Sequence, residues 1–114
     1  KGKFLLLLNN DIQAVDDFIT PLLQIFDSFK HAGAAGGKLI YPSGLLQEAG
    51  VLVFKEAHAM NIGRMEHPDF WMYNFVREVD YCSAALLMIK KEDWIAVDGF
   101  DERYAPAYFE DSDL

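Results

Sequence analysis

The sequence predicts an α/β fold, and three observations support this prediction. Short, continuous apolar runs, typical of buried strands, occur at residues 4–8 and 84–89. Between them, residues 15–29 carry apolar side chains at helical spacing. The 114 residues are 52% hydrophobic and 14% aromatic. That composition is typical of a packed domain and excludes a disordered chain.

The first element is predicted at residues 4–8, as a central strand of a covered, parallel sheet. It is apolar on both faces, and strands of parallel sheets are usually buried on both faces. Asn9, Asn10 and Asp11 follow it directly. They would lie at the carboxyl edge of the sheet, which is where open α/β sheets bind their ligands.

An amphipathic helix is predicted over residues 15–29, because apolar side chains recur there at intervals of three and four. Pro21 leaves two alternatives for its start. Pro21 stands at the first helical position after a Thr20 cap, or it lies in a first turn that begins near Asp16. The helix is expected to end before Gly33.

The later elements are predicted from alternation, turn residues and apolar runs. A hairpin is expected at residues 34–41 and 45–54, around the turn Pro42-Ser43-Gly44. Residues 55–70 have no period and are predicted to form a long loop, which inside a compact domain is usually functional or mobile. The remaining predictions are strands at residues 76–82 and 84–89 and a short helix at 92–97.

Charge and cysteine content exclude several classes of function. The net charge is −8 and the isoelectric point is near 4.6, so we expect no nucleic-acid partner. Cys82 has no second cysteine for a disulfide and is predicted to be a small buried hydrophobe. It does not stand at a metal-ligand spacing from His58 and His67. The apolar run near the start is far shorter than the roughly 20 residues of a transmembrane helix. No transmembrane segment or signal peptide is therefore predicted, and the expected location is cytoplasmic.

Both ends of the chain suggest a piece of a longer catalytic domain. Lys1 precedes the first apolar run almost directly, without an initiator methionine, and the chain stops at Leu114 without a polar tail. Residues 1–114 are therefore expected to be a single partial domain.

Two acidic groups are candidates for chemistry, Asn9-Asn10-Asp11 and Glu110-Asp111-Ser112-Asp113. Each also has a structural interpretation. Asp11 is a common turn former or helix cap after a strand. Carboxylates such as those at 110–113 also favour the first turn of a helix, where they interact with the helix dipole.

Five short segments, taken together, are more specific than either acidic group. They are Leu7-Leu8-Asn9-Asn10-Asp11, Tyr41-Pro42-Ser43-Gly44 with Gln47-Glu48-Ala49-Gly50, Ser83-Ala84-Ala85, Gly99-Phe100-Asp101-Glu102, and Pro106-Ala107-Tyr108-Phe109-Glu110-Asp111-Ser112-Asp113-Leu114. Their order resembles the second half of the catalytic domain of family 2 glycosyltransferases, especially the bacterial rhamnosyltransferase-like branch. The resemblance covers almost the whole chain.

The resemblance implies part of a GT-A fold, the nucleotide-diphospho-sugar transferase fold, with a mixed sheet flanked by helices. The N-terminal nucleotide-binding unit of that fold would be missing. The implied reaction moves a sugar from a nucleotide-diphospho donor, such as a UDP- or dTDP-sugar, to a hydroxyl of a glycan or lipid-linked acceptor, with inversion. Its implied setting is polysaccharide biosynthesis, in the cytoplasm or at the inner face of the membrane.

The resemblance also implies roles for individual residues. Asn9, Asn10 and Asp11 lie where the family carries its Asp-x-Asp motif, which binds the donor diphosphate. Asp11 matches the last Asp, the ligand of Mg²⁺ or Mn²⁺, whereas Asn9 departs from the first Asp and leaves one firm carboxylate ligand. Asp111 matches the catalytic base, with Glu110 beside it. The segment that borders the acceptor site contains Gly99, Asp101, Glu102 and Tyr104.

The alternative to an enzyme is a non-catalytic remnant or binding module with the same fold. Intact carboxylates at both Asp11 and Asp111 favour the enzyme. Without the nucleotide-binding unit we expect the isolated chain to be inactive. Sheet edges left exposed where that unit would pack also predict a homo-oligomer.

Overall fold

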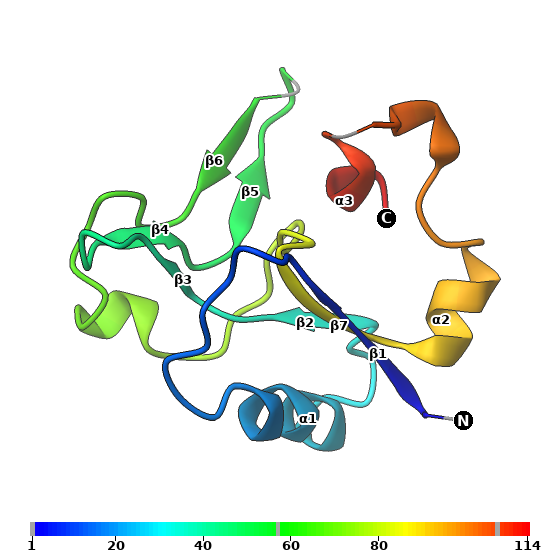
Figure 1. The fold of residues 1–114 in the computed structure, drawn as a ribbon, viewed down its shortest axis with the longest axis horizontal. Coiled ribbons are helices and arrows are strands. Elements are labelled where there is room, and N and C mark those ends of the chain that lie inside the picture. Colours follow the sequence, from blue (N-terminus) through cyan, green and yellow to red (C-terminus); the bar gives the residue numbers. More distant parts are fainter. Residues whose placement is uncertain (1, 57, 107) are drawn as a thin grey trace.

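A computed structural model describes residues 2–56, 58–106 and 108–114, and it has the predicted α/β architecture (Figure 1). Ala107, in the last of the five segments above, lies outside the described residues. The elements are β1 (Phe4–Leu8), α1 (Ile19–Ser28), β2 (Ala34–Gly36), β3 (Leu39–Ile40), β4 (Leu46–Glu48), β5 (Val51–Val53), β6 (Ala59–Asn61), the 3-10 helix η1 (Trp71–Tyr73), β7 (Leu86–Lys90), α2 (Lys91–Ala96), the 3-10 helix η2 (Glu102–Tyr104) and α3 (Glu110–Asp113).

The main sheet has the strand order β1-β7-β2, and both pairs are antiparallel. The first four residues of β7 are buried, whereas Leu6 and Leu8 of β1 are 36% and 46% exposed. The prediction of a central strand in a parallel sheet at residues 4–8 is therefore wrong. Within the described residues, β1 is an edge strand and β7 is the central one. A continuous apolar run indicates a strand, but it does not reveal the direction of the neighbouring strand.

Helix α1 covers one face of this sheet and forms the core with it (Figure 1). Leu22 and Phe26, one helical turn apart, are both buried together with Ala35 of β2 and Met88 of β7. This confirms the predicted amphipathic helix, because its buried residues lie on the face that the spacing indicated.

The start of α1 differs from the predicted Thr20 cap. The carboxylate of Asp17 accepts hydrogen bonds from the backbone N–H groups of Ile19 and Thr20, each at 3.1 Å. It thereby satisfies two donors that have no partner within the helix. Pro21 lies in the first turn, where its missing N–H removes no helical hydrogen bond. The second predicted alternative is therefore the closer one.

Two small hairpins complete the fold, β3 with β4 and β5 with β6. The turn at residues 42–44 is confirmed, but the predicted strand at 34–41 is divided between β2 and β3, which belong to different sheets. The predicted strand at 45–54 is divided at Gly50, which has a φ of +93°. Such a backbone conformation interrupts regular strand geometry.

Two further predictions are wrong. Residues 55–70 are not a loop throughout, because β6 lies within them and pairs with β5. Residues 76–82 form no strand and contribute one isolated bridge, between Tyr81 and Val51. Asp80 in this segment accepts a hydrogen bond from the backbone N–H of Val53 at 2.7 Å. Asp80 thus holds a loop against β5 and does not lie on the solvent-exposed face of a sheet. The predictions at 84–89 and 92–97 are confirmed as β7 and α2.

Across the described ranges, no helix combines the length and the apolar composition needed to cross a lipid bilayer.

Candidate functional site

The turn after β1 lines a groove with a volume of about 700 Å³. Asn9 and Asp11 lie on one side of it, and Tyr41 and Gln47 come from the β3–β4 hairpin. Lys38, which precedes β3, is the basic residue among the side chains that line the groove. The groove thus combines three carboxylates, those of Asp11, Asp16 and Asp17, with amides, a phenol and a single amine, which are groups that can bind a polar ligand or a cation.

Backbone hydrogen bonds fix the turn after β1 to the segment before β7. The N–H of Asn9 donates to the carbonyl of Ala85 at 3.0 Å, and the N–H of Ile12 donates back to the carbonyl of Asn9 at 3.2 Å. Asn10 is exposed in the same turn but does not line the groove. Of the predicted diphosphate-binding residues, Asn9 and Asp11 therefore face the groove and Asn10 does not.

The predicted base, Asp111, reaches the same segment from the other end of the chain. It belongs to α3, and its Oδ2 atom accepts a hydrogen bond from the backbone N–H of Ala84 at 3.2 Å. Asn9, through its backbone N–H, and Asp111, through its carboxylate, therefore bind two successive residues just before β7, Ala85 and Ala84. The two predicted groups thus reach one short segment of the chain, but Asp111 is not among the residues that line the groove. Glu110, beside Asp111, is half-buried, and its Oε2 atom has no hydrogen-bond partner within the described part of the chain.

The backbone that leads into α3 is unusual. Tyr108 and Phe109 have φ values of +81° and +72°, although neither is a glycine. Such conformations cost on the order of 1–3 kcal/mol each and occur preferentially at functional sites. The carboxylates of Glu110, Asp111 and Asp113 lie in the first turn of α3, where the helix dipole favours them. The structural interpretation of these acids is therefore confirmed, and their catalytic role stays a prediction.

The four predicted acceptor residues have different surroundings. Asp101 is held by Arg103, whose Nε donates to Asp101 Oδ2 at 2.7 Å and whose Nη2 donates to the same oxygen. The hydrogen bonds from Arg103 lower the pKa of Asp101. Tyr104 donates its hydroxyl proton to Asp113 Oδ1 at 3.3 Å, which links this segment to α3. Glu102 is exposed in η2.

Gly99, the fourth of them, has a packing role. Its φ is +72°, and a Cβ atom there would lie 2.9 Å from the indole ring of Trp94. Of the four residues, Tyr104 is the one with a hydrogen bond to the acidic helix.

Glu48 is part of the site, although the sequence pattern alone gives it no role. It is 4% exposed, and it is the charged residue buried in the core within the described ranges. Its Oε2 accepts from Asn61 Nδ2 at 2.8 Å, and its Oε1 accepts from the backbone N–H of Ser83 at 3.3 Å. Strand alternation could have indicated this, because Glu48 shares a face of β4 with Leu46, which is fully buried.

The residues present would fit a shared metal site, not a cage made by the protein alone. Within residues 2–56, 58–106 and 108–114, no three side chains of His, Cys, Asp or Glu form a group that could hold a metal ion. Mg²⁺ is commonly held by one or two carboxylates together with substrate phosphates. Asp11, exposed in the groove, provides one such carboxylate.

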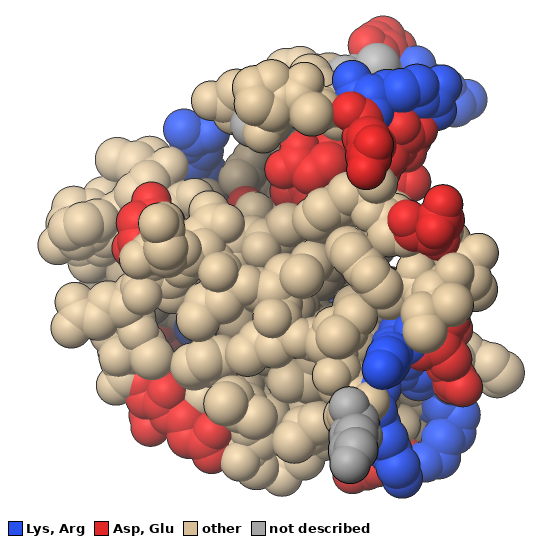
Figure 2. Space-filling model, turned by 45° about the vertical axis from the view of Figure 1, so that its right-hand side comes forward, with Lys and Arg blue, Asp and Glu red and all other residues tan. Residues whose placement is uncertain are grey.

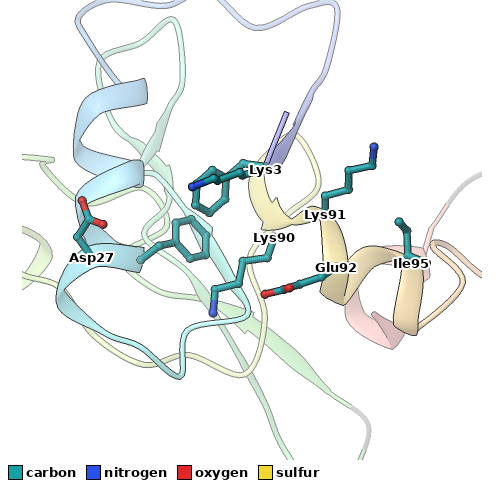
Figure 3. Close-up of a pocket in the computed structure, with 8 residues that line it drawn as sticks. Lys3, Asp27, Lys90, Lys91, Glu92 and Ile95 are labelled. Carbon is teal, nitrogen blue, oxygen red and sulfur yellow. The ribbon is translucent and has the colours of Figure 1, made fainter. Parts of the chain in front are cut away.

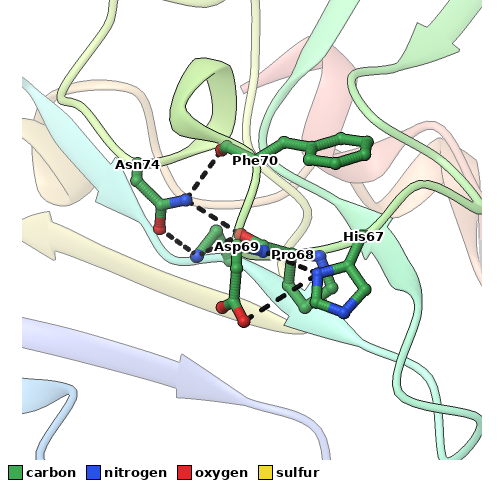
Figure 4. A network of polar contacts seen from close by, with 6 residues as sticks. His67, Pro68, Asp69, Phe70 and Asn74 are labelled. Atoms are coloured by element: carbon green, nitrogen blue, oxygen red, sulfur yellow. Dashed lines mark hydrogen bonds and ion pairs between the residues drawn. The ribbon is translucent and has the colours of Figure 1, made fainter.

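Lys38 is held in place by the loop before η1 and by the residue after it. Its Nζ donates to Asn74 Oδ1 at 2.6 Å and to the carbonyl of Pro68 at 3.1 Å. Asn74 in turn donates to the carbonyls of Pro68 and Phe70 (Figure 4). The predicted loop at 55–70 therefore supports one wall of the groove.

A second pocket, of about 530 Å³, contains none of the predicted site residues (Figure 3). It lies at the opposite end of β1, where Lys3, Lys90 and Lys91 surround apolar rings, and Lys90 Nζ is 5.9 Å from the ring centre of Phe26. Figure 2 shows basic side chains at the lower right and at the upper right of the face in view, with carboxylates beside them in both places. The lining of this pocket holds three lysines and two carboxylates, Asp27 and Glu92, so its local charge differs in sign from the net charge of −8.

The chain is similar to two curated proteins. The O-antigen biosynthesis protein RfbC of Myxococcus xanthus is 31% identical over 109 residues, which are 90% of this chain and 8% of that protein. The uncharacterized protein y4gI of Sinorhizobium fredii is 30% identical over an aligned region of 121 residues, which covers 100% of this chain and 13% of that protein. The chain thus spans about a tenth of the length of these relatives. No family model and no solved structure matches it.

Proposed function

We propose that this chain is the C-terminal portion of the catalytic domain of an inverting, metal-dependent family 2 glycosyltransferase of the rhamnosyltransferase-like branch. The observation that carries the proposal is that Asn9 and Asp111 bind successive residues, Ala85 and Ala84, just before β7. This supports a scheme in which the turn after β1 binds the donor and Asp111 acts as the base. The similarity to an O-antigen biosynthesis protein supports a role in assembling a polysaccharide.

In the proposed reaction the acceptor hydroxyl attacks the anomeric carbon of the donor sugar. The new bond joins the acceptor oxygen to that carbon, while the bond from the carbon to the phosphate oxygen breaks and its electron pair leaves with the nucleoside diphosphate. Asp111 accepts the proton of the hydroxyl, because a sugar hydroxyl is a weak nucleophile without a base. Attack from the face opposite the leaving group inverts the configuration.

The groove around Asp11 suits the departing diphosphate. A bound Mg²⁺ or Mn²⁺ would neutralise the charge that develops on this group. Asp11 would hold the cation together with the phosphates, and Asn9 would contribute an amide oxygen. The proposed donor is a UDP- or dTDP-sugar, the proposed acceptor is a glycan or a lipid-linked glycan, and the proposed location is the cytoplasm or the inner face of the membrane.

Paramagnetic broadening by Mn²⁺ tests the donor site without requiring turnover. In NMR spectra of the labelled 114-residue chain, Mn²⁺ with pyrophosphate or UDP should broaden the amide signals of Asn9, Asp11 and Ala85. Asp11→Asn should weaken binding at least about tenfold, because it removes the carboxylate ligand. Asp27→Asn is the matched control, since Asp27 is exposed beside the other pocket.

Broadening that is absent from these amides, or equal in Asp11→Asn and the wild-type chain, would overturn the proposed donor site. The non-catalytic binding module would then be the better interpretation. Its support in the structure is that Asp111 already serves as a hydrogen-bond acceptor for the backbone of Ala84.

A further inference from the structure

Glu48 is a carboxylate in the core whose charge is not matched by a cation. Burial of a carboxylate is costly unless its oxygens are hydrogen-bonded. Both of its oxygens are, one to Asn61 and the other to the backbone of Ser83. Neither of the two ion pairs found within the described ranges includes Glu48. A carboxyl group buried at this cost is a candidate for a role beyond packing.

Three consecutive backbone N–H groups before β7 point at side-chain oxygens. The N–H of Ser83 donates to Glu48 Oε1, that of Ala84 to Asp111 Oδ2 at 3.2 Å, and that of Ala85 to Ser83 Oγ at 3.2 Å. Successive N–H groups of this kind form a local region that attracts negative charge. Glu48 and Asp111 therefore bind neighbouring peptides of one short segment.

We propose that Glu48 is a positioning residue for Asp111, because it holds the peptide next to the one on which the Asp111 carboxylate rests. This inference rests on the proposed function, in which Asp111 is the base. Glu48 does not touch the reacting atoms in this scheme. It holds the Cys82–Ser83 peptide through the N–H of Ser83, and the next peptide, Ser83–Ala84, carries the N–H that donates to Asp111.

The segment also brings the two carboxylates into electrostatic contact. The titratable groups that face Glu48 are all acids, namely Asp111 on α3 and Tyr81 and Cys82 before β7. Burial raises the pKa of Glu48 and the negative charge of Asp111 raises it further, while hydrogen bonds from Ser83 and Asn61 act in the opposite direction. A change in the charge of Asp111 should therefore change the pKa of Glu48.

The first test is the carboxyl titration of Glu48, followed by NMR in the ¹³C-labelled 114-residue chain. Asp111→Asn should lower the pKa of Glu48 by on the order of 0.5 pH unit, as expected for the loss of one nearby charge. Asp113→Asn is the matched control. It removes a charge from the same helix, but Asp113 is bonded to Tyr104 instead, so the pKa of Glu48 should stay unchanged. An equal pKa in both variants would overturn the inference.

The second test measures hydrogen exchange at the amide of Ala84. Glu48→Ala should speed this exchange about tenfold, because the neighbouring peptide loses its anchor. Glu48→Gln should restore slow exchange, since Gln can accept from Ser83 and donate to Asn61 once the Asn61 amide is turned over. Unchanged exchange in Glu48→Ala would overturn the positioning role. If Glu48→Ala does not fold, the titration still tests the inference, because Asp111→Asn changes a residue outside the core.

These outcomes are separate from those of the Mn²⁺ experiment. A lower pKa of Glu48 in Asp111→Asn, together with no Mn²⁺ broadening at Asp11, would overturn the transferase proposal. It would also remove the catalytic reason for the positioning. Broadening at Asp11 without the coupling would overturn the role of Glu48 alone.

Discussion

Gly63 is a position where a single added methyl group should both strain the backbone and overpack the core. Gly63 follows β6 and has a φ of +74°, a region that residues with a Cβ atom rarely adopt. A Cβ atom there would lie 2.8 Å from Leu46 Cδ1 and 2.8 Å from Tyr73 Cε1. Leu46 is fully buried and cannot move aside freely. Gly63→Ala therefore combines backbone strain with overpacking.

The expected loss is the sum of these two effects. Forcing an alanine into the left-handed region costs roughly 1–2 kcal/mol. Inserting a methyl group into a packed contact costs about 1–3 kcal/mol. Gly63→Ala should therefore lower the free energy of unfolding by roughly 2–5 kcal/mol.

Gly44→Ala is the matched control, because Gly44 has a φ of +85° and a Cβ atom added there would meet no atom within 4 Å. It should lose the strain contribution alone, roughly 1–2 kcal/mol. Urea unfolding followed by tryptophan fluorescence gives both values under the same conditions. Losses that agree to within about 0.5 kcal/mol would show that the contact with Leu46 and Tyr73 does not exist as described.

Three further predictions concern the side chains of Glu48, Cys82 and Lys38. Burial raises the pKa of Glu48 above 4.5, so its contribution to stability is complete below pH 4.5 and is lost as the pH rises through the folded-state pKa. Urea unfolding should show wild type losing stability relative to Glu48→Gln from pH 4.5 upward, and a constant difference would contradict this. Burial also raises the pKa of Cys82, so iodoacetamide should alkylate it more slowly at about pH 8 than in the urea-unfolded chain; equal rates would be inconsistent with burial. Lys38→Met removes the hydrogen bonds to Pro68 and Asn74 and should cost about 1 kcal/mol, with faster amide exchange at residues 67–74 as the diagnostic readout. Unaltered exchange there would exclude a supporting role for Lys38.

The parts of the fold that could be predicted from the sequence are those set by local pattern. The helix over residues 15–29, the turn at 42–44 and the buried strand at 84–89 each depend on spacing or on turn residues within a short stretch. The direction of the neighbours of β1 and the pairing of β6 depend on residues far away in the chain. Such pairing leaves no local signature, so a strand such as β6 cannot be recognised within an aperiodic segment.

The same distinction applies to the site. The turn at Asn9–Asp11 and the acids at 110–113 could be found as residues, because strand ends and short acidic runs are visible in the sequence. Their meeting could not be predicted from periodicity, because it depends on two hydrogen bonds to the peptides of Ala84 and Ala85. The role of Glu48 is hidden in the sequence for a related reason, since a carboxylate in a strand is usually exposed.

The hydrogen bond that Asp111 accepts determines which substitutions can change the orientation of this candidate base. Within the described ranges, no lysine or arginine forms an ion pair with Asp111, and its hydrogen bond comes from the backbone of Ala84. A side-chain partner could be replaced by a single substitution, whereas a backbone donor is supplied by whatever residue occupies the position. The orientation of Asp111 therefore depends on how β7 enters the sheet and on what holds the peptide before Ala84. Glu48, anchored by Asn61 at the end of β6, is the side chain that holds it. Substitutions that disturb the β5–β6 hairpin should therefore change the orientation of Asp111, although they lie far from it in the sequence. Substitutions that only remove charge around α3 should leave that orientation unchanged.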